Sequence, residues 1–155
     1  MDVRTTINLA PGDRKRLDGA AELAGVTRSA LVVMLIGREL KDHRRLVTCW
    51  ESVRYQRRDP GKKRCRVHVA FNGRDYELCL DSRKLFKRSV SLLVAFAIEH
   101  YLDEILQVLQ TSGKADGMDN YPFTSYLLTC ETIGDSICWR IYWNIPPNPG
   151  QIFQN

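Results

Sequence analysis

The stretch from Ala30 to Ile36 constrains the fold more than any other part of this 155-residue chain, because every residue in it is apolar. Thr27 precedes it as a suitable N-cap, and a helix is predicted from there to about Asp42. Such a helix is apolar on nearly every side. Because a helix that faces solvent keeps a polar side, we expect this one to be buried between other elements or between subunits.

A strand and a first helix are predicted ahead of this buried helix. Residues 4–9 alternate, so one side of the strand would carry Thr5, Ile7 and Leu9, and the other Arg4, Thr6 and Asn8. Pro11 suits the first turn of a helix, and apolar residues then recur at helical spacing as far as Ala24. Gly25 fits the left-handed position that ends a helix. The order is strand, helix, buried helix.

This N-terminal part resembles the CopG/Arc-type ribbon-helix-helix family over residues 3–42, about a quarter of the chain. The resemblance rests on three features that occur together: a strand, a helix of about fourteen residues and a junction before the apolar helix. The strand is Arg4-Thr5-Thr6-Ile7-Asn8-Leu9, and the junction is Gly25-Val26-Thr27-Arg28-Ser29-Ala30-Leu31. The resemblance implies an intertwined homodimer that binds double-stranded DNA.

A single short strand leaves unpaired backbone groups along its edges, and antiparallel pairing with the same strand of a second copy would satisfy them. The resulting two-stranded ribbon fits the major groove of B-DNA. Arg pairs with guanine and Asn with adenine, while Thr offers a hydroxyl and a methyl group. The predicted base contacts from both subunits are therefore Arg4, Thr6 and Asn8.

The second helix begins at a DNA phosphate in this family, and the resemblance assigns that contact to Thr27, Arg28 and Ser29. The free backbone N–H groups of Arg28 and Ser29, the Ser29 hydroxyl and the helix dipole would form it. The alternative is an ordinary α+β domain, in which the same segment is an edge strand followed by two helices.

Positive charge is concentrated in the first part of the chain. Residues 1–66 contain 16 Lys and Arg against 8 Asp and Glu, a net +8, whereas residues 67–155 contain 7 against 10, a net −3. This split is typical of a polyanion-binding part joined to a different module. Residues 46–66 are predicted to be a basic linker with a break at Pro60-Gly61. Two interpretations stay open, a solvated tether and non-specific DNA contacts through Arg54, Arg57, Arg58, Lys62, Lys63 and Arg64.

Residues 67–155 are predicted to form a small α+β module. Alternating residues on both sides of Asn72-Gly73 predict a β-hairpin over about 67–80. A short helix over Arg83–Arg88 and a longer one over about Val90–Gln110 would follow. An alternative is a degenerate second ribbon-helix-helix over 76–110, although no residue-level repeat is evident.

Two strand-like runs near the C-terminus predict a second hairpin. They cover about 124–132 and 137–145 and are joined by a turn at Ile133-Gly134-Asp135-Ser136. The predicted fold class is therefore α+β. A ribbon-helix-helix unit would occupy residues 1–45, the basic linker 46–66, and the α+β module 67–155.

Several classes of protein are not indicated. No stretch approaches the roughly 18 apolar residues that cross a bilayer, and the N-terminus lacks the apolar segment of a secretory signal, so we expect a cytoplasmic protein. No phosphate-binding loop, dinucleotide fingerprint or hydrolase motif occurs. The five Cys and three His residues show no metal-ligand spacing. We predict no enzyme, no metal and no cofactor.

Together these features predict a sequence-specific DNA-binding transcriptional regulator, a repressor that occupies its site as a dimer. Residues 67–155 would sense a small effector, form tetramers or bind a partner protein. One alternative is an antitoxin-like protein whose C-terminal module neutralises a partner while the N-terminal part autoregulates. Another is a ligand- or metal-responsive regulator.

Overall fold

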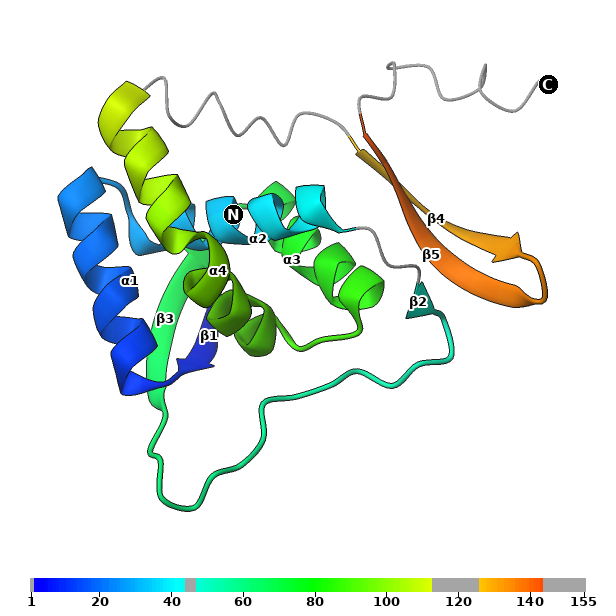
Figure 1. Ribbon diagram of the computed structural model, residues 1–155, viewed down its shortest axis with the longest axis horizontal. Helices are drawn as coiled ribbons and strands as arrows, with labels where there is room; N and C mark the ends of the chain where they lie inside the picture. The colour runs from blue at the N-terminus through cyan, green and yellow to red at the C-terminus, as the bar shows by residue number, and fades with distance from the viewer. Residues whose placement is uncertain (1, 44–46, 113–125, 144–155) are drawn as a thin grey trace.

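Two successive segments of the chain have the same order of elements, a strand followed by two helices. A computed structural model describes residues 2–43, 47–112 and 126–143. Unit 1 consists of β1 (Val3–Leu9), α1 (Pro11–Ala24) and α2 (Arg28–Asp42); unit 2 consists of β3 (Cys65–Phe71), α3 (Gly73–Phe86) and α4 (Val90–Ser112) (Figure 1). Each element of unit 2 begins 62 residues after its counterpart in unit 1. The predicted α+β class is confirmed.

The correspondence between the units extends to the ends of their helices. Gly25 after α1 and Lys87 after α3 both have left-handed backbone, with φ of 64° and 52°. The hydroxyl of Thr27 accepts a hydrogen bond from Ala30 N at the start of α2, and that of Ser89 accepts one from the equivalent N–H at the start of α4. The predicted roles of Gly25 and Thr27 are thereby confirmed, and unit 2 repeats both.

β1 pairs with β3 of the same chain, so the predicted pairing of residues 4–9 with a second copy is wrong in this structure. The two strands are antiparallel, with Val3 opposite Phe71 and Leu9 opposite Cys65. A strand tethered to the same chain has a high effective concentration at the edge of β1. Pairing within the chain therefore satisfies the backbone groups along one edge of β1 without the entropic cost of associating with a second copy.

The predicted hairpin around Asn72-Gly73 is also wrong, because α3 begins there. The Asn72 side chain accepts a hydrogen bond from Asp75 N at 2.8 Å and caps the helix. Asn is favoured at N-caps as well as in turns, and the strand before it already has β1 as its partner. The predicted short helix over 83–88 is instead the end of α3 and its connection to α4. The alternative prediction placed a second strand-helix-helix segment at residues 76–110, whereas unit 2 begins earlier, at Cys65.

A single hydrophobic core joins the two units. All residues from Leu31 to Gly37 in α2 are buried, as the apolar run predicts. α2 packs against α4, and both lie against one side of the β1–β3 ribbon (Figure 1). The predicted helix over about Val90–Gln110 is confirmed as α4. That side of the ribbon is lined by Ile7, Leu9, Val67, Val69 and Phe71, which are all buried.

One acidic side chain lies inside this core. Glu39 of α2 is only 3% exposed, and its Oε1 accepts a hydrogen bond from the Arg88 guanidinium at 3.2 Å. Burial raises the pKa of this carboxyl to about 8, although the positive charge of Arg88 acts in the opposite direction. The equivalent position of unit 2 is Tyr101, so this carboxyl distinguishes the two units.

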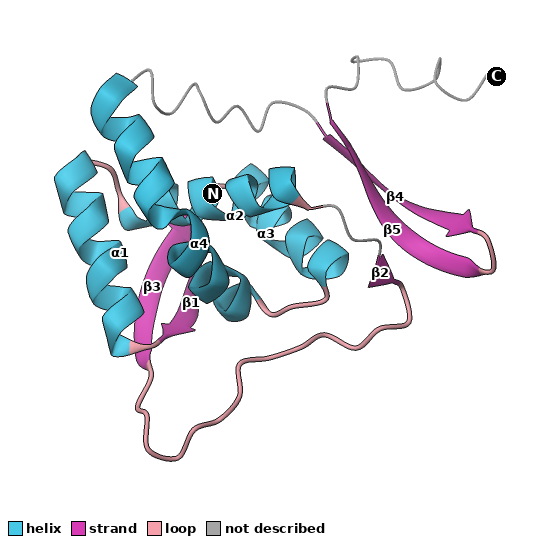
Figure 2. Ribbon diagram, viewed as in Figure 1, coloured by secondary structure: helices cyan, strands magenta, loops and turns pink. Residues whose placement is uncertain are grey.

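A three-stranded sheet lies beside α3, away from the ribbon (Figure 2). Its order is β2 (Val47–Thr48), β5 (Ser136–Trp143), β4 (Tyr126–Ile133), which confirms the predicted C-terminal hairpin. Predicted strand residues 124–125 and 144–145 lie outside the described residues. The Tyr126 hydroxyl donates to Asp81 of α3 at 2.9 Å, and the Lys84 ammonium lies 5.6 Å from the centre of the Trp139 ring. These contacts place the sheet on α3.

Within the described ranges, no single helix is both long enough and apolar enough to cross a bilayer. α1 and α2 reach that length only when taken together, across a bend of 106°.

Candidate nucleic-acid interface

The outer side of the β1–β3 ribbon is formed by every second residue of each strand. In β1 the exposed residues are Arg4, Thr6 and Asn8, while Ile7 and Leu9 are buried, as the alternation predicts. In β3 the exposed residues are Arg66, His68 and Ala70. We call these six residues the ribbon face. It contains two cations and no acidic residue.

The strand register arranges the ribbon face in three cross-strand pairs. Thr6 lies opposite His68 at the centre, and its Oγ1 is 3.3 Å from the His68 Nδ1. At one end Arg4 lies opposite Ala70, and at the other Arg66 lies opposite Asn8. We call these the Arg4 end and the Arg66 end. Because the two arginines are diagonal to each other, each end has one guanidinium.

Each end of the ribbon is attached to the start of a helix by a serine. The Ala70 N–H donates to the Ser29 hydroxyl of α2 at 2.9 Å, and the Asn8 N–H donates to the Ser91 hydroxyl of α4 at 3.0 Å. These hydrogen bonds are related by the same offset of 62 residues. They place the N-terminus of α2 at the Arg4 end and that of α4 at the Arg66 end. The positive ends of two helix dipoles therefore lie on either side of the ribbon face.

The three predicted phosphate-contacting residues meet different partners at the start of α2. The Thr27 hydroxyl caps the helix, and the Ser29 hydroxyl accepts from Ala70. The Arg28 guanidinium forms an ion pair with Asp18 of α1, with an N–O distance of 2.6 Å. Arg28 is therefore held against α1 by its side chain. Its backbone N–H belongs to the first turn, where the helix supplies no acceptor.

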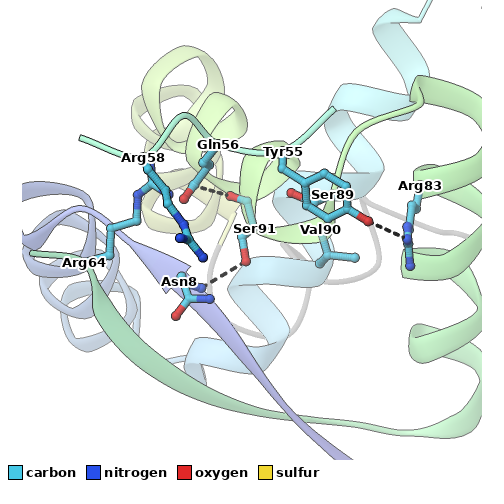
Figure 3. Close-up of a pocket in the computed structure, with 9 residues that line it drawn as sticks. All are labelled: Asn8, Tyr55, Gln56, Arg58, Arg64, Arg83, Ser89, Val90 and Ser91. Atoms are coloured by element: carbon cyan, nitrogen blue, oxygen red, sulfur yellow. Dashed lines mark hydrogen bonds between the residues drawn. The ribbon is translucent and has the colours of Figure 1, made fainter. Parts of the chain in front are cut away.

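A hollow of about 580 Å³ lies at the Arg66 end, beside the start of α4 (Figure 3). The loop between β2 and β3 closes one side of it, since the Gln56 side chain donates to the Ser91 carbonyl at 3.0 Å. On the other side Arg83 of α3 donates to the Tyr55 hydroxyl. Arg58 and Arg64 line the same hollow as Asn8. The guanidinium groups of Arg58, Arg64 and Arg83 therefore line this hollow.

The structure brings only part of the predicted basic linker to the ribbon. The six predicted cations are all exposed, and Arg58 and Arg64 lie at the hollow. The backbone of Arg54 instead pairs with the α3–α4 connection, where its N–H donates to Lys87 O and its carbonyl accepts from Ser89 N. The Lys62 ammonium lies 3.7 Å from the carboxylate of Asp59 in the same turn. The structure shows no contact of Arg57 or Lys63 with the ribbon.

The structure adds site residues that sequence analysis missed, all of them in unit 2. They are Arg66, His68, Ser89 and Ser91, together with Arg83 beside the hollow. A signal was present: Thr27-Arg28-Ser29-Ala30-Leu31-Val32 and Ser89-Val90-Ser91-Leu92-Leu93-Val94 have the same pattern 62 residues apart. The stronger hairpin signal at Asn72-Gly73 obscured this repeat.

Comparison with known proteins gives no relative. No protein-family model matches the chain, and neither curated proteins nor solved structures contain a match. Among the described residues, no group of three or more His, Cys, Asp or Glu side chains is arranged to hold a metal ion. The candidate site therefore depends on the geometry and chemistry of the ribbon face alone.

Proposed function

We propose that this protein binds double-stranded DNA sequence-specifically and acts as a transcriptional repressor, with the β1–β3 ribbon in the major groove. The main support is the ribbon face, where five of the six side chains carry hydrogen-bonding groups and none is acidic. A two-stranded ribbon fits the width of the major groove, where each base pair presents a distinct pattern of donors and acceptors. The Arg, Asn, Thr and His side chains of the ribbon face suit that pattern.

The flanking helices support the same proposal. The first-turn N–H groups of α2 and α4 lie beside opposite ends of the ribbon, where the phosphates on either side of a major groove would approach. Arg58 and Arg64 would add affinity that does not depend on sequence and that weakens with salt. The proposed phosphate contacts are thus the starts of both long helices and these two cations.

We also infer that units 1 and 2 together form a ribbon-helix-helix pair within one chain. The support is the intrachain pairing of β1 with β3 and the common core of α2 and α4. One chain would then provide both strands of the ribbon. A contact with a second copy or a partner protein would have to use another surface, because the ribbon is already complete.

A gel-shift series with the full chain tests the function. A site would first be selected from random duplex DNA. The double variant Arg4→Ala with Asn8→Ala is expected to lose specific binding, because each truncated base contact costs about 1–3 kcal/mol of discrimination. Arg140→Ala on β5 also removes one positive charge, but far from the ribbon, and it should bind like the unmodified protein. Equal binding by the double variant would contradict the proposal.

A further inference from the structure

We propose that the DNA site of this protein is non-palindromic and is bound in one orientation. The inference rests on the proposed function and adds the class of sequence that the ribbon face recognises. A homodimer presents the same residues twice, so its preferred site repeats about a two-fold axis. Here the two strands are different segments of one chain, and nothing requires their exposed residues to match.

The backbone of the two units has an approximate two-fold relation that passes through the centre of the ribbon face. Thr6 and His68 are opposite each other in the register, and they are also equivalent residues separated by the offset of 62. The hydrogen bonds from Ala70 to Ser29 and from Asn8 to Ser91 obey the same relation. Each end of the ribbon therefore approaches DNA with the same backbone geometry.

The side chains do not follow this relation. Only the arginines, Arg4 and Arg66, are the same in both strands. The Arg4 end combines a guanidinium with the methyl group of Ala70, and the Arg66 end combines one with the amide of Asn8. Arg pairs with guanine, Asn pairs with adenine, and Ala contacts the methyl group of thymine. We therefore expect guanine at both outer positions, with an adenine contact on one side only.

The residues around the two ends of the ribbon also differ, and the Arg66 end has more positive charge beside it. The hollow at the Arg66 end receives Arg58 and Arg64 from the loop between β2 and β3. The hollow of about 530 Å³ at the Arg4 end is lined only by ribbon residues and Ser29. Among the described residues, no equivalent loop lines the hollow at the Arg4 end. Phosphate contacts are thus stronger on one side, but they do not depend on sequence, so the orientation on the site is set by the base contacts of Asn8 and Ala70.

Selection from random duplex DNA with the full chain, followed by footprinting, tests the inference. The selected sequence should lack two-fold symmetry, and exchange of the adenine pair should weaken binding about 10- to 100-fold on the Asn8 side alone. A variant with His68→Thr and Ala70→Asn makes the two strands equivalent on the ribbon face. It should gain preference for a palindrome by a similar factor. Both replaced residues are exposed, so the fold should tolerate them.

Arg58→Ala is the matched control, because it changes a phosphate-directed cation and leaves the ribbon face intact. It should weaken binding to all sequences alike and reduce the salt dependence. A palindromic selected site for the unmodified protein would overturn the inference and leave the proposed function standing. Failure to select any duplex sequence would overturn the proposed function and the inference together.

Discussion

Units 1 and 2 share a backbone plan but few side chains. α1 and α3 each have 14 residues, and three equivalent positions are buried in both, namely Leu17 with Cys79, Ala20 with Ser82, and Ala24 with Phe86. The other buried positions differ, since Ala21 is buried whereas the equivalent Arg83 is exposed. The buried Ser82 hydroxyl donates to Leu78 O at 2.6 Å, which satisfies it within its own helix. The shared backbone plan therefore depends on a few common buried positions and on the helix ends, whereas residue identity at those positions differs between the units.

The units differ in the residues that form equivalent helix ends and in helix length. α1 begins after Ala10 without a side-chain cap, whereas Asn72 caps α3. The left-handed position is Gly25 in unit 1 but Lys87 in unit 2, where a side chain is strained. Lys87 has a compensating contact, since its ammonium donates to Cys49 O at 3.0 Å. α4 has 23 residues against 15 in α2, and the extra turns extend the shared core.

The largest expected effect tests whether the units form one folding unit. Leu31→Ala and Leu93→Ala truncate equivalent, fully buried side chains on α2 and α4. Each should lower the free energy of unfolding by about 3 kcal/mol. Because both belong to one core, chemical denaturation of either variant should show a single transition by both far-UV and fluorescence signals. Two separate transitions would mean that the units are stabilised independently.

The next effect concerns Glu39, which has no acidic counterpart in unit 2. Its pKa is raised to about 8 in the folded protein, above the value near 4.5 of an unperturbed carboxyl. The folded state therefore binds more protons between these values, and stability should fall as the pH rises from about 4.5 to 8. Glu39→Gln removes this loss, and we expect it to be at least about 2 kcal/mol more stable than the unmodified protein at pH 9.

Thermal unfolding at a series of pH values checks this expectation. At pH 4 the Glu39→Gln variant and the unmodified protein should have similar stability, because the carboxyl is protonated in both states. Glu99→Gln on the exposed side of α4 is the control, and it should show no such divergence. A stability difference for Glu39→Gln that does not change with pH would contradict the assignment of the raised pKa.

The smallest effect concerns the helix caps. Asn72→Ala removes the side-chain cap of α3 and should cost about 1 kcal/mol, whereas Ala10→Asn supplies the missing cap of α1 and should gain up to about that amount. Urea denaturation of both variants measures the difference. An unchanged free energy of unfolding for Asn72→Ala would contradict this expectation. It would mean that the two units differ in the geometry of their caps but not in the stability that the caps contribute.

Sequence reasoning predicted unit 1 well because its signals are local. The alternation of residues 4–9, the cap at Thr27 and the left-handed Gly25 each depend on a few neighbouring residues, and the structure contains all three. The same reasoning failed in unit 2 at Asn72-Gly73. Asn followed by Gly suits a hairpin turn and also the start of a helix, so the local signal was ambiguous.

By itself the sequence determined which segments form the helices of unit 1, that α2 is buried, and that Arg4, Thr6 and Asn8 are exposed together. Only the tertiary structure decided that β3 is the partner of β1. An open strand edge accepts any strand of suitable pattern, and the one tethered nearby is favoured. That choice brought Arg66 and His68 onto the ribbon face and Arg58 and Arg64 to one end of it. The candidate site is therefore a product of long-range pairing.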